Sequence, residues 1–162
     1  MPIDFSSQVI TGLMGTVLGV LLASALSWTR SRRERRLNLT LELYAEFHAP
    51  AFNHIRIEAY GALERNGAGV PATYLAATTQ ERVAISAVVH FFEKLALLRE
   101  TGAVNPSLLK RFFGQYAHFW RPLLCAQPGI DDPEWSQTLR AIQRLFAELD
   151  ALPKKDPTNP RP

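Results

Sequence analysis

The chain has 162 residues and one cysteine, Cys125, so an internal disulfide is excluded and a reducing compartment is favoured. Its net charge is +3, but residues 30–36 hold five arginines and one glutamate, a charge of +4, so the remainder sums to −1. The basic character therefore comes from one short segment, which excludes a broad nucleic-acid-binding face.

The first predicted element is a membrane-spanning helix over residues 9–28, preceded by a short external N-terminus at residues 1–8. No charged side chain occurs between Asp4 and Arg30. Twenty helical residues at about 1.5 Å each span about 30 Å, the thickness of a bilayer's hydrocarbon core. The alternatives are a signal peptide cleaved near Ala23-Ser24-Ala25 and a buried helix of a soluble core. The N-terminus lacks the positive charge of signal peptides, and the arginines that follow the run favour a span over a core helix.

Those arginines predict the orientation of the span. Five of them follow it and none precedes it, so the positive-inside rule places the N-terminus outside and the rest of the chain in the cytoplasm. Trp28 is expected at the headgroup boundary, and the cluster is expected to attract anionic lipid. The predicted membrane-surface residues are Trp28, Arg30, Arg32, Arg33, Arg35 and Arg36.

Small residues recur at every fourth position of the predicted span and line one helix face. They are Thr11, Gly15, Gly19, Ala23 and Ser27. Small side chains let two helices approach closely in lipid, so Gly15, Gly19 and Ala23 are the predicted contacts of a homo-oligomer. The alternative is that such residues are simply common in membrane spans.

The remaining elements are all predicted to be helical. A basic juxtamembrane helix over residues 29–49 continues the span to about His48, where Pro50 disfavours helix. A bundle of about four helices over residues 50–152 follows, and a disordered, proline-rich tail at 153–162 ends the sequence. The first bundle helix is expected over residues 51–65, followed by a loop over residues 66–73.

Three further helices have marked beginnings. Thr78 and Glu81 have the spacing of a capping box, and the helix they open is stopped by Gly102. Asn105-Pro106 and Asp132-Pro133 each combine a capping side chain with a first-turn proline. Two adjacent apolar stripes in the Thr78 helix give it a wide buried face, which predicts that it is the central helix of the bundle.

The basic cluster, the stretch from Val88 to Leu98, Gly102 and the stretch from Tyr116 to Leu124 together resemble a bacterial family. Its members are small proteins with one N-terminal transmembrane helix and a helical cytoplasmic domain of unknown function. The resemblance covers about residues 5–150. It implies a single-pass protein of the bacterial inner membrane, and it transfers no catalytic residue.

Few residues suggest chemistry. His90 and Glu93 share one helix face, as metal ligands of helical bundles do, but the spacing is reversed and has no second copy. His54 with Glu58, and Glu42 with Glu46, would have to converge with them to hold a metal. Cys125 has no neighbouring histidine in sequence, and no nucleophile or phosphate-loop motif is present. We therefore expect no catalytic residue, metal or cofactor, and an enzyme is the less favoured interpretation.

The sequence thus predicts a membrane-anchored helical interaction or scaffold protein. Aromatic residues and arginine dominate protein contacts, so a protein partner is expected at Tyr116, His118, Trp120 and Arg121. If Trp120 instead belongs to the core, its replacement by alanine would unfold the bundle. The alternatives are a membrane-bound enzyme or metal protein that uses His90 and Glu93, and a small regulatory subunit of a membrane complex.

Overall fold

The computed structural model describes residues 5–67, 69–125 and 135–151, with side chains from residue 23 onward. The described residues form six helices and no strands, which confirms the all-α class. The helices are α1 (Phe5–His48), α2 (Pro50–Asn66), α3 (Val70–Ala76), α4 (Thr79–Glu100), α5 (Pro106–Leu124) and α6 (Ser136–Ala151). By their contacts, residues Met1–Arg36 and Leu37–Pro162 form two compact units.

In the N-terminal unit, the structure describes the helical backbone from Phe5 and the side chains from Ala23. No helix of the described part combines the length and the apolar character that crossing a membrane requires. Most of the predicted span at residues 9–28 lies outside the residues whose side chains are described, and so do Gly15 and Gly19.

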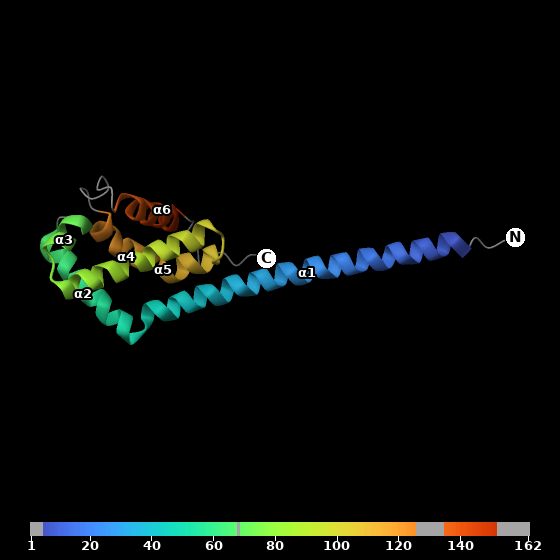
Figure 1. Ribbon diagram of the computed structural model, residues 1–162, viewed down its shortest axis with the longest axis horizontal. Coiled ribbons are helices and arrows are strands. Elements are labelled where there is room, and N and C mark those ends of the chain that lie inside the picture. Colours follow the sequence, from blue (N-terminus) through green and yellow to red (C-terminus); the bar gives the residue numbers. More distant parts are fainter. Residues whose placement is uncertain (1–4, 68, 126–134, 152–162) are drawn as a thin grey trace, which may run out of the picture. The chain divides into compact units, whose positions relative to one another are not determined.

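In the second unit, α4 is the central helix, as its two apolar stripes predict (Figure 1). It packs against α2 on one side and α6 on the other, and α6 also packs against α5. Both predicted stripes of α4 are buried, including Ile85, Val88, Phe92 and Leu95. Direct contact between α2 and α5 is sparse by comparison.

The core begins earlier in the chain than the predicted start of the bundle at residue 50. Leu43 and Phe47, near the end of α1, are fully buried. The Phe47 ring lies 4.9 Å from Phe91 and 5.5 Å from Phe113, measured between ring centroids. Residues 37–48 are therefore part of the bundle rather than a linker, because aromatic burial of this kind is a main source of packing energy.

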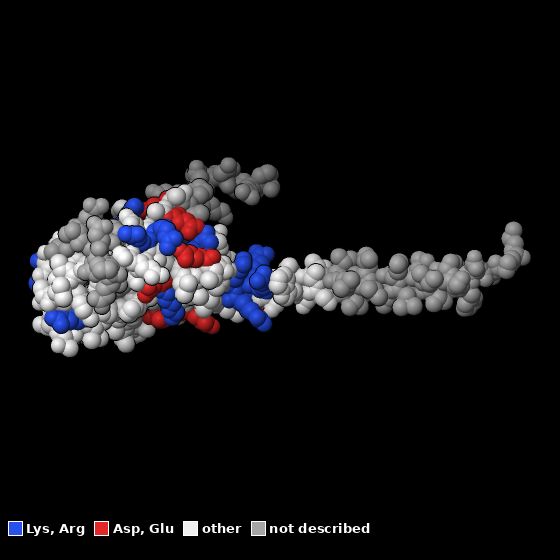
Figure 2. Space-filling view, turned by 45° about the horizontal axis from the view of Figure 1, so that its top comes forward, with Lys and Arg blue, Asp and Glu red and all other residues white. Residues whose placement is uncertain are grey.

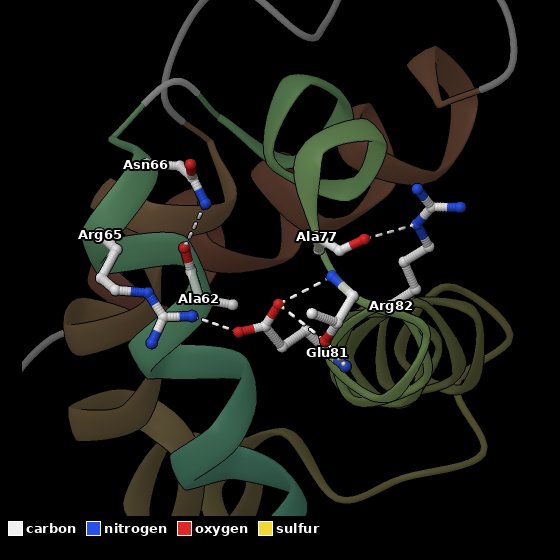
Figure 3. Close-up of polar contacts among 7 residues, drawn as sticks. Ala62, Arg65, Asn66, Ala77, Glu81 and Arg82 are labelled. Atoms are coloured by element: carbon white, nitrogen blue, oxygen red, sulfur yellow. Dashed lines mark hydrogen bonds and ion pairs between the residues drawn. The ribbon is translucent and has the colours of Figure 1, made fainter.

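Local signals set the helix boundaries between α2 and α4 (Figure 3). Asn66 Nδ2 donates to the carbonyl of Ala62 at 3.0 Å near the end of α2. Gly67 then adopts φ 58°, a left-handed conformation that suits glycine at a helix end. Thr78 and Glu81 form the predicted capping box, with the Thr78 N–H donating to Glu81 Oε2 at 2.8 Å.

The Glu81 carboxylate also connects two helices, because it pairs with Arg65 of α2. Its hydrogen bonds from Thr78, first from the backbone and then from the side chain, hold the pKa of Glu81 below its usual value, and Arg65 adds to this effect. Arg82 Nε donates to the carbonyl of Ala77 at 3.0 Å, which ties the start of α4 to the end of α3.

Two other predicted starts have different outcomes. Asn105 caps α5 as expected, since its side chain accepts hydrogen bonds from the N–H groups of Ser107 and Leu108. The predicted start at Asp132-Pro133 lies outside the described residues. The structure describes α6 from Ser136.

The predicted loop over residues 66–73 is wrong in its second half, where α3 begins at Val70. Pro71 lies in the first turn of α3, a position where a proline supports a helix rather than breaking it. Val70 and Thr73 are buried, so packing against the bundle stabilises this helix, which is too short to form from helix propensity alone.

Candidate functional site

The candidate site is a groove between α2 and α5, which we call the α2–α5 groove. It has a volume of about 350 Å³ and is open to solvent. Its lining comes from one stripe of each helix, spaced by three and four residues, so that the side chains of a stripe project the same way. The lining residues are Asn53, Arg56, Ile57, Tyr60, Gln115, Tyr116, Phe119 and Trp120.

Aromatic rings supply half of the lining residues of the groove. Trp120 is only 2% exposed and lies at the floor, in contact with the core. The Tyr60 ring stacks on Phe119 with centroids 5.2 Å apart and meets Trp120 edge-on at 6.5 Å. These contacts join α2 to α5 through rings rather than through close backbone packing, so a hollow is left between the helices.

Two large apolar side chains of the groove remain in water. Ile57 is 62% exposed and Phe119 is 48% exposed. Exposed apolar residues are ordinary when they are scattered, but these two flank a hollow in which three of the other six residues are aromatic. The groove therefore offers apolar surface that a partner could cover.

Arg56 is the only charged residue in the lining of the groove. Its guanidinium carbon lies 4.1 Å from the ring centroid of Phe47 and 5.6 Å from that of Tyr116. Nη2 donates to Asn53 Oδ1 at 2.7 Å, whereas Nε is buried with no hydrogen-bond partner among the described residues. The cation is thus held against rings, in a setting that strengthens its attraction for an anion.

Tyr116, the second tyrosine that lines the groove, is held in place by a hydrogen bond to His48. The Tyr44 carbonyl can only accept, so His48 Nδ1, at 2.8 Å, donates to it. In the neutral ring Nε2 then accepts from the Tyr116 hydroxyl, also at 2.8 Å. This bond connects the end of α1 to α5 and holds one wall of the groove in place.

Tyr60 has its own polar anchor on α2. Its hydroxyl donates to Glu64 Oε1 at 2.5 Å. That hydrogen bond to a carboxylate raises the pKa of Tyr60 above its ordinary value, with smaller contributions from burial and from the Glu64 charge. Glu64 thereby orients the ring that stacks on Phe119.

The structure separates the four residues predicted to bind a partner. Tyr116 and Trp120 line the α2–α5 groove, but Trp120 is a core residue rather than an exposed contact. His118 and Arg121 are exposed beside α6, in a separate shallow hollow that also includes Cys125. The four residues thus form no single surface, because spacings of two and five residues on a helix point in different directions.

The hollow beside α6 contains one paired cation and one protonated thiol. Arg121 forms an ion pair with Asp150 of α6. Burial raises the pKa of the Cys125 thiol to about 11 and outweighs the opposing effect of the nearby Arg121 charge. A thiol with that pKa is a poor nucleophile at neutral pH, so Cys125 has the character of a structural cysteine.

The predicted metal candidates are adjacent but have no third ligand. His90 Nδ1 lies 3.2 Å from Glu93 Oε2, and Glu93 also accepts from Thr138 Oγ1 of α6. Glu46, which would have to join them, instead pairs with Lys94 at 2.8 Å. Within the described part of the chain, no group of three or more His, Cys, Asp or Glu residues is placed to hold a metal.

The predicted membrane-surface residues form one exposed stretch of α1. Trp28 is 59% exposed, and Arg30, Arg32, Arg33, Arg35 and Arg36 are all exposed. The Arg32 guanidinium lies 4.3 Å from the Trp28 ring centroid, and Arg30 pairs with Glu34 at 3.1 Å. Figure 2 shows basic side chains gathered on this stretch, whereas acidic and basic side chains are interspersed on the visible face of the bundle. Ala23, from the predicted pairing face, is also exposed.

Sequence reasoning singled out two of the eight lining residues, Tyr116 and Trp120, and both lie on α5. It predicted a helix over residues 51–65 but did not single out the stripe of α2 that contains Arg56, Ile57 and Tyr60. That stripe lies beside the buried stripe of Ala59, Ala62 and Leu63. The available signal was that Ile57 and Tyr60 are large apolar or aromatic residues three apart and off the core stripe.

Fold and site together define an all-helical bundle with an aromatic, arginine-bearing groove on one side. Residues 13–123 match the family described as a domain of unknown function (DUF4760), and the chain belongs to that family. All eight lining residues of the groove fall within the matched region. A search of curated proteins and a search of solved structures each gave no match.

Proposed function

We propose that this chain is a membrane-anchored interaction module that binds a protein partner in the α2–α5 groove. The observation that carries the proposal is the groove itself, in which rings and an arginine surround apolar side chains left in water. Tryptophan, tyrosine and arginine are the residues that dominate binding energy at protein interfaces. The groove offers tyrosine and arginine to a partner, while the buried Trp120 supports its floor.

The anchor is supported by the sequence of the N-terminal segment. A charge-free run of about twenty residues is followed by five exposed arginines, with Trp28 between the run and the cluster. In this proposal residues 9–28 cross the inner membrane of a bacterium and the bundle lies in the cytoplasm. A tether confines the bundle to a plane, which raises its effective concentration toward partners in the same membrane.

Fractionation of cells tests the anchor. We expect the full chain to sediment with membranes on ultracentrifugation and to enter the supernatant only after a surfactant is added. A variant that lacks residues 1–29 is the matched control and should stay in the supernatant. Full-length chain that remains in the supernatant without surfactant would contradict the anchor. Fusions of alkaline phosphatase and of a fluorescent protein to the C-terminus test the orientation, and only the fluorescent fusion should be active.

Site-specific photo-cross-linking in cells tests the groove. A photoreactive residue is placed at Ile57 in the groove or at Val83 on α4, whose side chains are 62% and 63% exposed. We expect a discrete cross-linked product from position 57 that is absent at position 83 and lost when Phe119 is replaced by aspartate. Equal products at both positions would show that contact follows exposure alone, and the groove would then not be the docking site.

The small-residue face supports self-association through the span as part of the same proposal. Gly15→Leu and Gly19→Leu remove the close approach of two helices without removing apolar character. We expect both variants to reduce cross-linking between protomers in bilayers, with Val17→Leu as the matched control. Unchanged cross-linking in the glycine variants would contradict the pairing.

A further inference from the structure

We propose that the partner segment in the α2–α5 groove is acidic: an amphipathic helix that carries an aspartate or glutamate within one turn of a large apolar side chain. This inference rests on the proposed function and adds the chemistry of the partner. It is carried by the charge balance of the groove and by the hydrogen-bonding state of Arg56.

The charge of Arg56 is not neutralised by the groove. The other seven lining residues are neutral, and Arg56 forms no ion pair among the described residues. Glu64 accepts a hydrogen bond from the lining residue Tyr60 and not from Arg56. Glu64 lies eight residues farther along α2, about 12 Å away at 1.5 Å per residue. A carboxylate of the partner would therefore meet an uncompensated cation.

The guanidinium is also held ready for an anion. The Phe47 and Tyr116 rings flank it, and the bond from Nη2 to Asn53 limits its rotation. Nε is buried and out of a partner's reach, whereas Nη1 is neither buried nor hydrogen-bonded among the described residues and can meet a carboxylate. Arginine binds carboxylates through two parallel N–H groups when its plane is fixed, which adds geometric selectivity to charge attraction.

The apolar part of the partner is assigned by the rim of the groove. Ile57 and Phe119 are exposed on opposite helices, and the stacked Tyr60 ring lies beside Phe119. The hollow between the two helices is open rather than closed over. An amphipathic helix fits this groove, because its side chains at every third and fourth position lie on one face. They can contact the aromatic rings and the Arg56 cation at the same time.

Selection from a phage-displayed library of random twelve-residue peptides tests the proposal, with the full-length chain in detergent micelles as the target. We expect wild-type chain to enrich peptides with an acidic residue within four positions of an aromatic or branched aliphatic residue. Arg56→Gln should lose the acidic preference, and Arg56→Lys should retain part of it because the charge remains. Arg111→Gln, which removes an exposed cation of α5 outside the groove, is the matched control and should select like wild type.

The best selected peptide is then compared with its own glutamate-to-glutamine version by calorimetry. A hydrogen bond to a charged group is worth about 1.5–3 kcal/mol, so the neutral peptide should bind at least about tenfold more weakly to wild type. With Arg56→Gln the two peptides should bind alike. Circular dichroism of each variant establishes that the bundle is folded during the measurement.

Other outcomes separate this inference from the proposed function. Neutral or basic peptides whose binding is lost in Ile57→Asp would overturn the acidic partner and leave the groove as a docking site. Peptides that bind equally well to Ile57→Asp, or a library with no enrichment, would overturn both. Phenylacetate that binds as tightly as the selected peptide would identify a site for small carboxylates instead of a protein segment, and the proposal would be wrong.

Discussion

Two sides of α5 differ in whether the charged group beside them is paired within the bundle. Beside α6, Arg121 has an ion-pair partner in Asp150 and the Cys125 thiol is partly buried and protonated. Toward α2, Phe119 remains half in water and Arg56 keeps a buried Nε without a partner among the described residues. The difference shows that two exposed sides of one helix can differ in whether the nearby positive charge is neutralised. The side toward α2, where the charge is not neutralised, is where a partner can add binding energy.

The largest expected effect distinguishes the floor of the groove from its rim. Trp120→Ala should destabilise the fold by about 3–5 kcal/mol, because it removes a buried tryptophan from the core. Phe119→Ala should cost about 1 kcal/mol at most, since the ring is half exposed and loses mainly its stacking on Tyr60. Urea unfolding followed by far-UV circular dichroism measures both. Equal losses would mean that Phe119 is a core residue and that the rim is not an open surface.

Thiol reactivity tests the side of α5 that faces α6. Because the pKa of Cys125 is raised to about 11, iodoacetamide should alkylate the folded chain at pH 8 about two orders of magnitude more slowly than the urea-unfolded chain. The folded rate should keep rising with pH until about 11. The folded state also holds this proton more tightly, so wild type should lose stability relative to Cys125→Ser as pH rises from about 9 toward 11. A folded rate that levels off by pH 9 would contradict this description of the α6 side.

Two buried threonines extend the contrast between paired and unpaired polar groups. Thr40 of α1 accepts from the N–H of Asn105 at 3.0 Å, whereas Thr73 Oγ1 of α3 has no partner among the described residues. Thr40→Val should cost about 1–3 kcal/mol because it leaves that N–H unsatisfied. Thr73→Val should be neutral or stabilising, by up to about 1 kcal/mol, because it removes a buried hydroxyl of similar shape. Differential scanning calorimetry compares them, and a loss at Thr73 as large as at Thr40 would point to a bound water there.

The smallest expected effect concerns the two arginines themselves. Arg121→Gln breaks a partly exposed ion pair and should change stability by less than about 1 kcal/mol, with a difference that shrinks in 1 M salt. Arg56→Gln should also have a small effect on stability, about 0.5–1 kcal/mol from lost cation–π contact. Binding of an acidic peptide should respond only to Arg56. A loss of peptide binding in Arg121→Gln would mean that the peptide contacts the α6 side of α5 and not the α2–α5 groove.

The sequence by itself determined the helical class and most helix boundaries, because these depend on neighbouring residues. Thr78 with Glu81, Asn105 with Pro106, and the break before Pro50 each act within one turn of the backbone. The two apolar stripes of α4 likewise predicted that it is the central helix. The exception was α3, where burial of Val70 stabilised a helix in a segment whose glycines and proline indicated a loop.

Only the tertiary structure decided which aromatic residues are core and which are surface. Trp120 and Phe119 are adjacent in sequence, yet one is buried and the other half exposed, since burial depends on where a neighbouring helix lies. Phe47 is a second case, because the sequence predicted it before the bundle and the fold places it in the core. Arg56 is a third case, because only the fold shows that it lines the groove. A contact between residues separated by sixty positions, such as Tyr116 with Arg56, leaves no periodic signal in either segment. The groove could therefore not be predicted without knowing how α2 and α5 pack on their shared neighbours.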